Sequence, residues 1–355
     1  MKRILVINPG ATSTKIAIFD EETAIFEKTL EHQGTELNQF AKIIDQYPYR
    51  LDLILDELAK ASIPLTSINA IVARGGLLKP LPGGTYAVNE RMVEDLKKAE
   101  RGEHASNIGA VIAYALSGQL RIPAFIVDPV SVDELEPVAR ISGLPDLPRV
   151  SLSHALNSKA VARNAAKEMG KRYEDVNLIT AHLGTGVTVA AHKNGKMIDV
   201  NNAQDDGPFS PDRCGGLPAS QLVKLCFSGK YDFSQLRRRM SGEGGMYAYL
   251  GTKDVRDAEK RAKEGDEAAD LVLDALAYQV AKEIGSMAAV LEGQVDRIII
   301  TGGIAYSKRI TEAIAARVKF IAPVVLAPGE AELRSLAAGA LRVLQGEELS
   351  RTYSG

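Results

Sequence analysis

The sequence predicts an α/β protein of two duplicated domains, and two observations support this prediction. An apolar run, a polar glycine-containing turn and a second apolar run follow each other at residues 4–19, and the same succession returns at residues 177–191. Two buried strands joined by a tight turn have this pattern. Three residues of the first hairpin match three of the second at one offset, 182 − 8 = 174, namely Asn8 with His182, Gly10 with Gly184 and Thr14 with Thr188.

Both turns are suited to bind an anion. Asn8-Pro9-Gly10 forms the first turn, and Ser13 and Lys15 add a hydroxyl and a positive charge on its far side. Backbone N–H groups in a tight turn, together with hydroxyls, form a concavity that accepts a phosphate. An ordinary surface β-turn is the alternative for either hairpin alone. The repetition at half-chain spacing favours the phosphate site.

Length and composition bound the remaining possibilities. The chain has 355 residues, which predicts two domains, and the proline-rich stretch 144–148 marks the boundary. We expect a first domain at 1–148, completed by a C-terminal helix at 331–355, and a second at 149–330. The net charge of −2 argues against a nucleic-acid partner. No apolar run approaches the roughly 18 residues of a membrane span, and the two cysteines favour a reducing cytoplasm.

The elements of the first domain follow from periodicity and from turn residues. Residues 23–30 continue the hairpin as a third strand, and residues 68–73 and 123–127 are short apolar runs typical of buried strands. Helical patterns occupy residues 37–61, with a break expected at Pro48, then 89–101 with Asn89 as the cap, and 108–120. Strands alternating with helices predict a parallel sheet.

The second domain opens with a helix at 151–169 and the second hairpin. Residues 201–217 lack periodicity and residues 241–251 are rich in glycine, so we expect loops there. Helix is expected at 254–292 and 307–318, strand at 295–300 and 324–329, and a last helix at 330–344 before a polar tail. A long irregular stretch inside a compact domain is commonly functional.

Four positions are candidates for chemistry because of where they stand. Arg74 and Asp128 each follow a predicted strand, and ligands gather at the carboxyl ends of strands in α/β sheets. His154 lies at a helix start, and Gly302-Gly303 leaves a strand at a turn that lets a flat ring lie close to the backbone. The alternatives are a surface arginine, a turn aspartate, a capping or core histidine and an empty strand-to-helix turn.

Several common motifs are absent. The sequence contains no GxxxxGK[ST] loop, no GxGxxG fingerprint, no HExxH and no GxSxG. These absences argue against P-loop enzymes, dinucleotide oxidoreductases and zinc sites.

The order of motifs resembles the acetate kinase family, within the superfamily of acetate and sugar kinases, heat-shock proteins and actin. The motifs that carry the resemblance run over nearly the whole chain, namely ILVINPGATSTK, ARGG, IVDP, SLSHALNSK, LITAHLGTGVTV and ITGGIA. The length and the first turn look most like the butyrate kinase branch. The resemblance implies two duplicated ribonuclease-H-like (actin-like ATPase) domains with a cleft between them, ATP/ADP and Mg²⁺ as cofactors, and a homodimer or larger assembly.

The resemblance also implies roles for particular residues. Arg74 would hold the substrate carboxylate, Asp128 would order the metal or the transferring phosphoryl group, His154 would stabilise the transition state, and Arg213 would be a second arginine of the site. The implied nucleotide contacts are Asn8, Ser13, Lys15, His182, Gly184 and Gly186, with Gly302 and Gly303 at the adenine. The metal-linked residues would be Asn8 and a C-terminal glutamate, Glu330 or Glu332, with Glu332 favoured because the following Leu333 matches the family's Glu-Leu pair.

The expected reaction turns a short-chain carboxylate, butyrate or a branched relative, into an acyl phosphate. A carboxylic acid has a pKa of about 4 and is already ionised near pH 7, so no general base is needed. A sugar hydroxyl, in contrast, needs a positioned acceptor for its proton. A hydroxyl kinase of the same superfamily and a non-enzymatic ATP-switched protein are the two alternatives.

Overall fold

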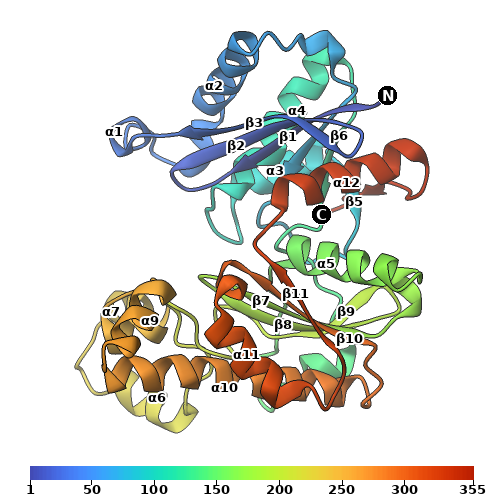
Figure 1. Cartoon of the computed structure of the whole chain (residues 1–355). Helices are drawn as coiled ribbons and strands as arrows, with labels where there is room; N and C mark the ends of the chain where they lie inside the picture. The colour runs from blue at the N-terminus through green and yellow to red at the C-terminus, as the bar shows by residue number, and fades with distance from the viewer. The chain divides into compact units, whose positions relative to one another are not determined.

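The computed structural model describes all 355 residues and contains two compact units. The first unit comprises residues 1–132 and 331–355, and the second comprises residues 133–330 (Figure 1). The first unit therefore ends at Val132 and not at Pro148. Residues 133–150 belong to the second unit because they bond to it: Glu136 N donates to Ile198 O at 3.0 Å, and Arg149 pairs with Asp199 at 3.0 Å.

A seven-stranded sheet forms the centre of the first unit, in the order β12-β5-β6-β4-β1-β2-β3. Its strands are β1 (Arg3–Pro9), β2 (Ser13–Asp20), β3 (Thr23–Glu31), β4 (Ala70–Arg74), β5 (Thr85–Ala87), β6 (Ala124–Val127) and β12 (Arg351–Thr352). Its helices are α1 (Gly34–Leu37), α2 (Tyr47–Lys60), α3 (Glu90–Lys98), α4 (Ser106–Leu120) and α12 (Glu332–Gln345), with 3₁₀ turns at Ile43–Gln46 and Leu65–Ser67.

A five-stranded sheet forms the centre of the second unit, in the order β11-β10-β7-β8-β9. Its strands are β7 (Leu178–Leu183), β8 (Val187–Lys193), β9 (Lys196–Val200), β10 (Arg297–Gly302) and β11 (Val324–Pro328). Its helices are α5 (Ala155–Glu168), α6 (Ala219–Cys226), α7 (Phe233–Met240), α8 (Gly245–Leu250), α9 (Val255–Lys263), α10 (Glu267–Val290) and α11 (Lys308–Val318), with 3₁₀ turns at Pro137–Arg140, Tyr173–Asp175 and Gly303–Tyr306.

The two sheets share one topology, which is the expected duplication. In the first unit, β1, β2 and β3 are antiparallel, β4 runs parallel to β1, and β6 runs parallel to β4. In the second unit, β7, β8 and β9 are antiparallel, β10 runs parallel to β7, and β11 runs parallel to β10. Five strands therefore have the same order and direction in both units, and β5 and β12 are additions to the first.

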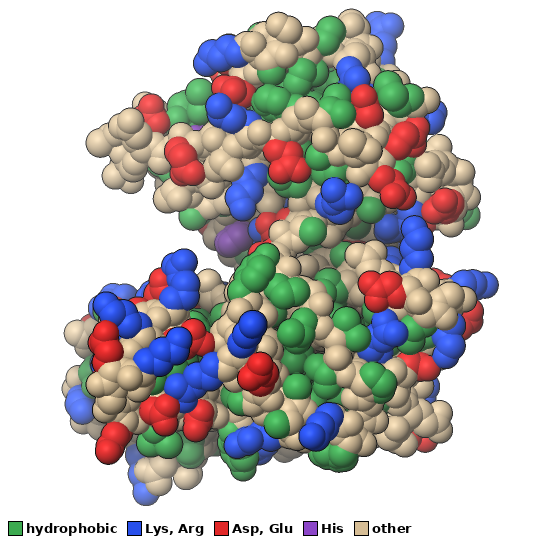
Figure 2. All heavy atoms as spheres, in the orientation of Figure 1, with side chains coloured by type: hydrophobic (Ala, Val, Ile, Leu, Met, Phe, Trp, Pro, Cys, Tyr) green, Lys and Arg blue, Asp and Glu red, His purple; other side chains and the backbone are tan.

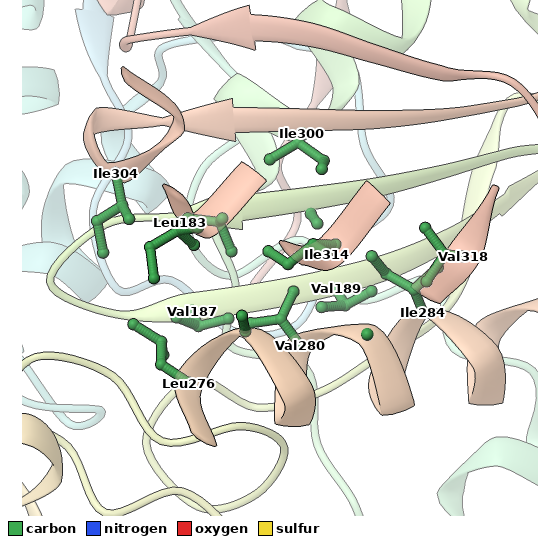
Figure 3. Close-up of a cluster of buried hydrophobic side chains, with 14 of the residues drawn as sticks. Leu183, Val187, Val189, Leu276, Val280, Ile284, Ile300, Ile304, Ile314 and Val318 are labelled. Carbon is green, nitrogen blue, oxygen red and sulfur yellow. The ribbon is translucent and has the colours of Figure 1, made fainter. Parts of the chain in front are cut away.

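Apolar side chains bury both faces of each sheet. In the second unit, α10 and α11 cover one face, and Leu276, Val280 and Ile314 share a buried apolar cluster with Val187 and Val189 (Figure 3). Helix α5 packs on the opposite face through small residues such as Ala162 and Ala166. Strands buried on both faces explain why the hairpin strands are continuous apolar runs and do not alternate.

Helix α12 joins the first unit although it comes from the end of the chain. Leu336 and Ala340 are fully buried, and a Cβ on Gly339 would lie 2.5 Å from the side chain of Val127 in β6. Only glycine permits this close approach between a helix and a strand. Beyond it, Tyr353 is buried and donates to Asp95, and β12 pairs with β5, so the tail that we expected to be only polar anchors the unit.

Two further expectations were wrong. The helix expected at 37–61 forms only from Tyr47, where α2 begins with Pro48 in its first turn and a missing N–H costs nothing, while residues 38–46 hold only a 3₁₀ turn. The glycine-rich stretch 241–251 is not all loop, because α8 forms within it and buries Met246 and Leu250. Burial of these side chains outweighs the poor helix propensity of glycine.

No helix combines the length and apolar composition needed to cross a bilayer.

Candidate active site

The first hairpin places three candidate residues on one face of its sheet. Asn8 at the end of β1 pairs across the strands with Lys15, and Ser13 lies two residues before Lys15 on β2. Directly opposed residues, and residues two apart on one strand, share a face. Lys15 is exposed, whereas Asn8 is buried. The hairpin thus offers an amide, a hydroxyl and an ammonium group on the same side.

Asn8, Arg74 and Glu332 meet at the carboxyl ends of β1 and β4. Asn8 Nδ2 donates to Glu332 Oε2 at 2.6 Å, and Arg74 Nη1 lies 2.9 Å from Glu332 Oε1. Glu332 comes from the first turn of α12, 324 residues after Asn8. The Oδ1 atom of Asn8 is buried without a hydrogen-bond partner. A buried polar atom without a partner calls for a ligand, because leaving it unpaired is costly.

Asp128 lies beside this group, directly after β6. Its side chain is 1% exposed, and its Oδ1 accepts from Gly84 N at 2.7 Å. Its backbone has φ +36°, a left-handed conformation in which only Asn, Asp and Gly are common. Gly75 and Gly76 after Arg74 are tightly packed, since an added Cβ would lie 2.5 Å from Pro129 and 2.4 Å from Asn107. The ARGG turn therefore needs both glycines.

The second hairpin has a shorter turn than the first. Pro9 pairs with Thr14 in the first hairpin, which leaves four residues in its turn, whereas Leu183 pairs with Val187 and leaves three. The offset of 174 therefore holds for β1 and β7 but becomes 188 − 15 = 173 for β2 and β8. The sequence pattern predicted Thr14 as the counterpart of Thr188. In the structure the counterpart is Lys15. Gly184 N donates to Gly186 O at 3.1 Å and closes the turn.

Two histidines stack beside this turn. The rings of His154 and His182 lie 3.9 Å apart at an interplanar angle of 9°. His154 stands at the N-cap position of α5, and its Nδ1 lies 3.2 Å from Thr188 Oγ1. His182 Nε2 is buried 3.1 Å from Glu330 Oε1 but is not aligned for a hydrogen bond. It is a second buried polar atom suited to a ligand.

A chain of hydrogen bonds through the side-chain amide of Asn157 sets the tautomer of His182. Asn157 Nδ2 lies 2.9 Å from His182 Nδ1 and donates to Thr301 Oγ1 at 3.1 Å, and Thr301 in turn donates to Gly329 O at 3.3 Å. An amide NH₂ group only donates, so Nδ1 must accept. The proton of the neutral imidazole is therefore on Nε2, which faces the turn.

Arg213 reaches the same turn from the irregular stretch 201–217. A Cβ on Gly186 would lie 2.6 Å from Arg213 Nη1 and 3.2 Å from His154 Cε1. Arg213 Nη1 also donates to Ala203 O at 3.2 Å, and its backbone N–H donates to Ser210 Oγ at 3.1 Å. Burial lowers the pKa of the guanidinium. Gly186 is required because any side chain would displace these groups.

A cavity of about 810 Å³ opens next to the second turn. Its walls come from the turn itself, from the Gly303–Tyr306 turn and from the start of α9, namely Gly184, Thr185, Pro211, Lys253, Asp254, Val255, Arg256, Glu259, Gly303, Ile304, Tyr306, Ser307 and Glu330. This volume is within the range of small-molecule sites and suits a nucleoside. Gly302 does not line the cavity: at φ +88° it packs against the backbone of Leu183, where a Cβ would lie 2.4 Å from the carbonyl oxygen.

Comparisons with known proteins identify the family of this chain. The profile of the acetokinase family matches residues 152–325. The chain is 54% identical to Butyrate kinase 1 of Clostridium acetobutylicum over 354 residues, which cover 99% of this chain and all of that protein. The chain belongs to the acetokinase family. It is also 53% identical to Butyrate kinase 2 of the same organism over 352 residues, 99% of each chain.

The fold has solved counterparts. The acetate kinase of Porphyromonas gingivalis superposes with a TM-score of 0.81 at 19% identity, covering 97% of this chain and all of that one. At this identity the likeness concerns the fold, and it confirms the predicted α/β class of two duplicated domains. The family assignment likewise confirms the resemblance drawn from the motifs.

The structure brings the candidate residues of this acetokinase-family chain together in two groups. The first unit gathers Asn8, Arg74 and Glu332, with Asp128 following the neighbouring strand. The second gathers His154, His182, Gly186, Arg213 and Glu330. Sequence reasoning missed Asn157 and the start of α9. The one sequence signal for the start of α9 was Asp254, a typical N-cap residue at the beginning of a charged helix.

His32 predicts a loss of stability in mild acid. It is 5% exposed, its Nε2 contacts Thr14 Oγ1 at 2.8 Å, and its Nδ1 has no partner. Burial first, and then the charge of Arg50, lower its pKa from 6.5 to about 4. The folded protein keeps His32 neutral while the unfolded chain takes up the proton. The free energy of unfolding should therefore fall by roughly 1–3 kcal/mol between about pH 6.5 and pH 4.

Urea unfolding at pH 7, 5.5 and 4.5 measures this loss. In a His32→Gln variant, which cannot titrate, the loss should be smaller by that amount, whereas His192, also buried with a lowered pKa, still contributes in both proteins. Equal losses in the two proteins would assign the acid sensitivity to other groups.

The tautomer of His182 gives a spectroscopic prediction. In an Asn157→Asp variant, a carboxylate replaces the donor amide and can only accept, so the proton of the His182 ring should move to Nδ1. Imidazole ¹⁵N chemical shifts report this change directly. His192, held by Tyr173 and Thr180, is the internal control and should keep its signals. Unchanged His182 shifts would mean that Asn157 does not set the tautomer.

Proposed function

We propose that this chain is an ATP-dependent kinase that phosphorylates butyrate, or a branched relative, reversibly to an acyl phosphate. The observation that carries the proposal is the 54% identity, over the full length, with a protein named Butyrate kinase 1. The geometry supports it, because both groups of candidate residues combine arginine with anion-binding turns. A kinase that uses ATP needs a compartment that contains ATP, so we propose a cytoplasmic location.

The reaction is a direct in-line transfer. A carboxylate oxygen attacks the γ-phosphorus, and the bond from that phosphorus to the bridging oxygen of ADP breaks. The carboxylate is already ionised, so the barrier is mainly the repulsion between two anions. We assign Arg74 to the carboxylate and Arg213 and His154 to the transferring phosphoryl group. Arginine suits both tasks because its planar fork contacts two oxygens at once.

The proposed ATP site rests on the second unit. The 810 Å³ cavity would take the adenosine, with Gly303 beside the ring, and His182 Nε2–H and the Gly184–Gly186 turn would meet the phosphates. Asn8, Ser13 and Lys15 would take the transferred phosphate in the first unit. These residues fit the group, since two buried polar atoms, Asn8 Oδ1 and His182 Nε2, have no hydrogen-bond partner within the protein.

We further propose Mg²⁺ as the companion ion. No group of three or more Asp, Glu, His or Cys side chains forms a closed metal cage. Mg²⁺ is commonly held by one or two protein oxygens together with water and substrate phosphates, so Asn8 Oδ1 and Glu332 are a sufficient set. When bound, the ion neutralises charge on the phosphates. Glu332 is preferred over Glu330 because it stands beside Asn8.

A hydroxamate assay tests the function. Purified protein is incubated with ATP, Mg²⁺, hydroxylamine and a series of short acids, and only an acyl phosphate is trapped. We expect hydroxamate with butyrate or isobutyrate and less with acetate, because each methylene contributes about 1–3 kcal/mol in a pocket. Phosphate transfer to a sugar without hydroxamate would indicate a hydroxyl kinase. ATP binding without transfer to either would indicate an ATP-switched protein.

We also propose that the protein assembles with itself through α6 and α7. Neither helix buries any residue, and Phe227 and Phe233 are 88% and 79% exposed. Apolar surface of this kind marks protein interfaces. We expect a dimer or larger species by light scattering, and monomers after Phe227→Asp with Phe233→Asp. The control is Phe320→Asp, which removes an equally exposed phenylalanine elsewhere. A monomeric wild type would exclude the proposal.

Charge supports a small-molecule substrate over a nucleic acid. The formal net charge is −2, and Figure 2 shows acidic and basic side chains intermixed on the visible face of both units. Nucleic-acid binding proteins present a continuous basic surface instead.

A further inference from the structure

Arg50 is a buried cation without a carboxylate partner. It lies in α2, is 0% exposed and is the bulkiest of the fully buried side chains. All its hydrogen bonds go to neutral groups, and burial lowers its pKa to about 10. Burying a charge without a counter-charge is costly. The position of this arginine therefore needs an explanation beyond packing.

The guanidinium holds the carbonyl groups of the first hairpin turn. Nη1 donates to Gly10 O at 2.8 Å and to Ser13 O at 3.1 Å, and Nη2 donates to Ala11 O at 3.1 Å. The remaining carbonyl, of Thr12, accepts from the backbone N–H of His32 at 2.8 Å. All four carbonyl oxygens of the turn are thus bound within the protein, three of them by Arg50.

Two N–H groups of the turn have no partner within the protein. Gly10 N donates to Ser13 O at 2.7 Å, whereas the N–H groups of Ala11 and Thr12 make no backbone hydrogen bond in this exposed turn. Two unpaired N–H groups beside the Ser13 hydroxyl form the type of concavity that binds anions. The positive charge of Arg50 is hydrogen-bonded to carbonyl groups of the same turn.

We propose that Arg50 is the positioning residue of this phosphate-binding turn, and that a phosphoryl group bound at the turn is its counter-charge. The assignment of that group to ATP or acyl phosphate rests on the function proposed above. A guanidinium is needed because one planar fork reaches three carbonyls, which the single nitrogen of lysine does not. Gln46 Oε1 orients the fork by accepting from Nε at 3.2 Å and from Nη2 at 2.8 Å.

Gln46 offers a direct test, because Gln46→Glu gives Arg50 a carboxylate without removing the fork. If the charge of Arg50 stabilises a bound phosphoryl group, this variant should be more stable than the wild type in the absence of ligand. It should also bind inorganic phosphate and ADP more weakly, by about 10- to 100-fold. Arg50→Lys should weaken binding similarly, because it keeps the charge and loses the fork. The control is Arg140→Lys, in which a residue paired with Asp133 in the second unit is changed.

The measurements are the rise in melting temperature with inorganic phosphate, the dissociation constant of ADP, and kcat and KM separately. We expect KM for ATP to rise in Gln46→Glu and Arg50→Lys, and adenosine, which lacks phosphate, to bind as in the wild type. A purely structural Arg50 would change the melting temperature without ligand and leave the phosphate-induced rise intact, and that result would overturn the inference. A wild type that binds phosphate but forms no hydroxamate would contradict the proposed function alone.

Discussion

Replacing Arg213 with alanine is expected to lower kcat by about 10³- to 10⁵-fold, with little change in the KM for ATP. The guanidinium lies against Gly186 in the turn assigned to the phosphates, and it is held there by Ala203 O and by the Ser210 hydroxyl. Its charge acts on the phosphoryl group as it moves between two anions, so the loss should concentrate in the transition state and not in ATP binding.

Steady-state kinetics with butyrate and ATP measure this effect. Arg213→Lys keeps the charge but loses the bidentate fork, so it should recover only part of the loss. Arg101→Ala, which removes an exposed arginine of the first unit, is the matched control and should behave as wild type. An Arg213→Ala enzyme with near wild-type turnover would remove this arginine from the site.

Asp128→Asn is expected to lower kcat by about 10²- to 10³-fold without unfolding the protein. The substitution removes the negative charge of the side chain and keeps its size and its oxygen acceptor. Asparagine tolerates the φ of +36°, and its side-chain oxygen can still accept from Gly84 N. What is lost is one negative charge beside the residues proposed to hold the metal and the phosphoryl group.

The comparison requires activity and stability from the same preparations. Melting temperature should change little in Asp128→Asn, whereas Asp128→Ala, which also removes the acceptor for Gly84 N, should lower both activity and melting temperature. Full metal-dependent activity in the Asn variant would leave Asp128 with only a turn-forming role.

Local patterns were sufficient to single out several members of the two candidate groups. Arg74 and Asp128 were recognised because each ends an apolar run, and a parallel sheet brings the ends of its strands to one edge. His182 was recognised because the second hairpin repeats the first. Each of these inferences uses residues that are close in sequence, where turn and strand propensities act.

The contacts that complete the site lie outside such patterns. Asn8 meets Glu332 across 324 residues, and Arg50 reaches the first turn from a helix whose periodicity marks it only as buried. The register of the second hairpin was wrong by one residue, because the length of a turn depends on pairing geometry that composition does not encode. Residues 253–256 became candidates only through the cavity that they line.

The sequence by itself determined the duplicated α/β fold, the two hairpins whose turns we propose to bind phosphate, and the family, because strand periodicity and turn chemistry are local properties. Only the tertiary structure decided where the first unit ends, that α12 packs on β6 through Gly339, and which buried groups orient the turns. These features depend on the close approach of segments hundreds of residues apart. Such contacts are selected by packing and by the cost of unpaired buried polar groups, which act only once the chain has folded.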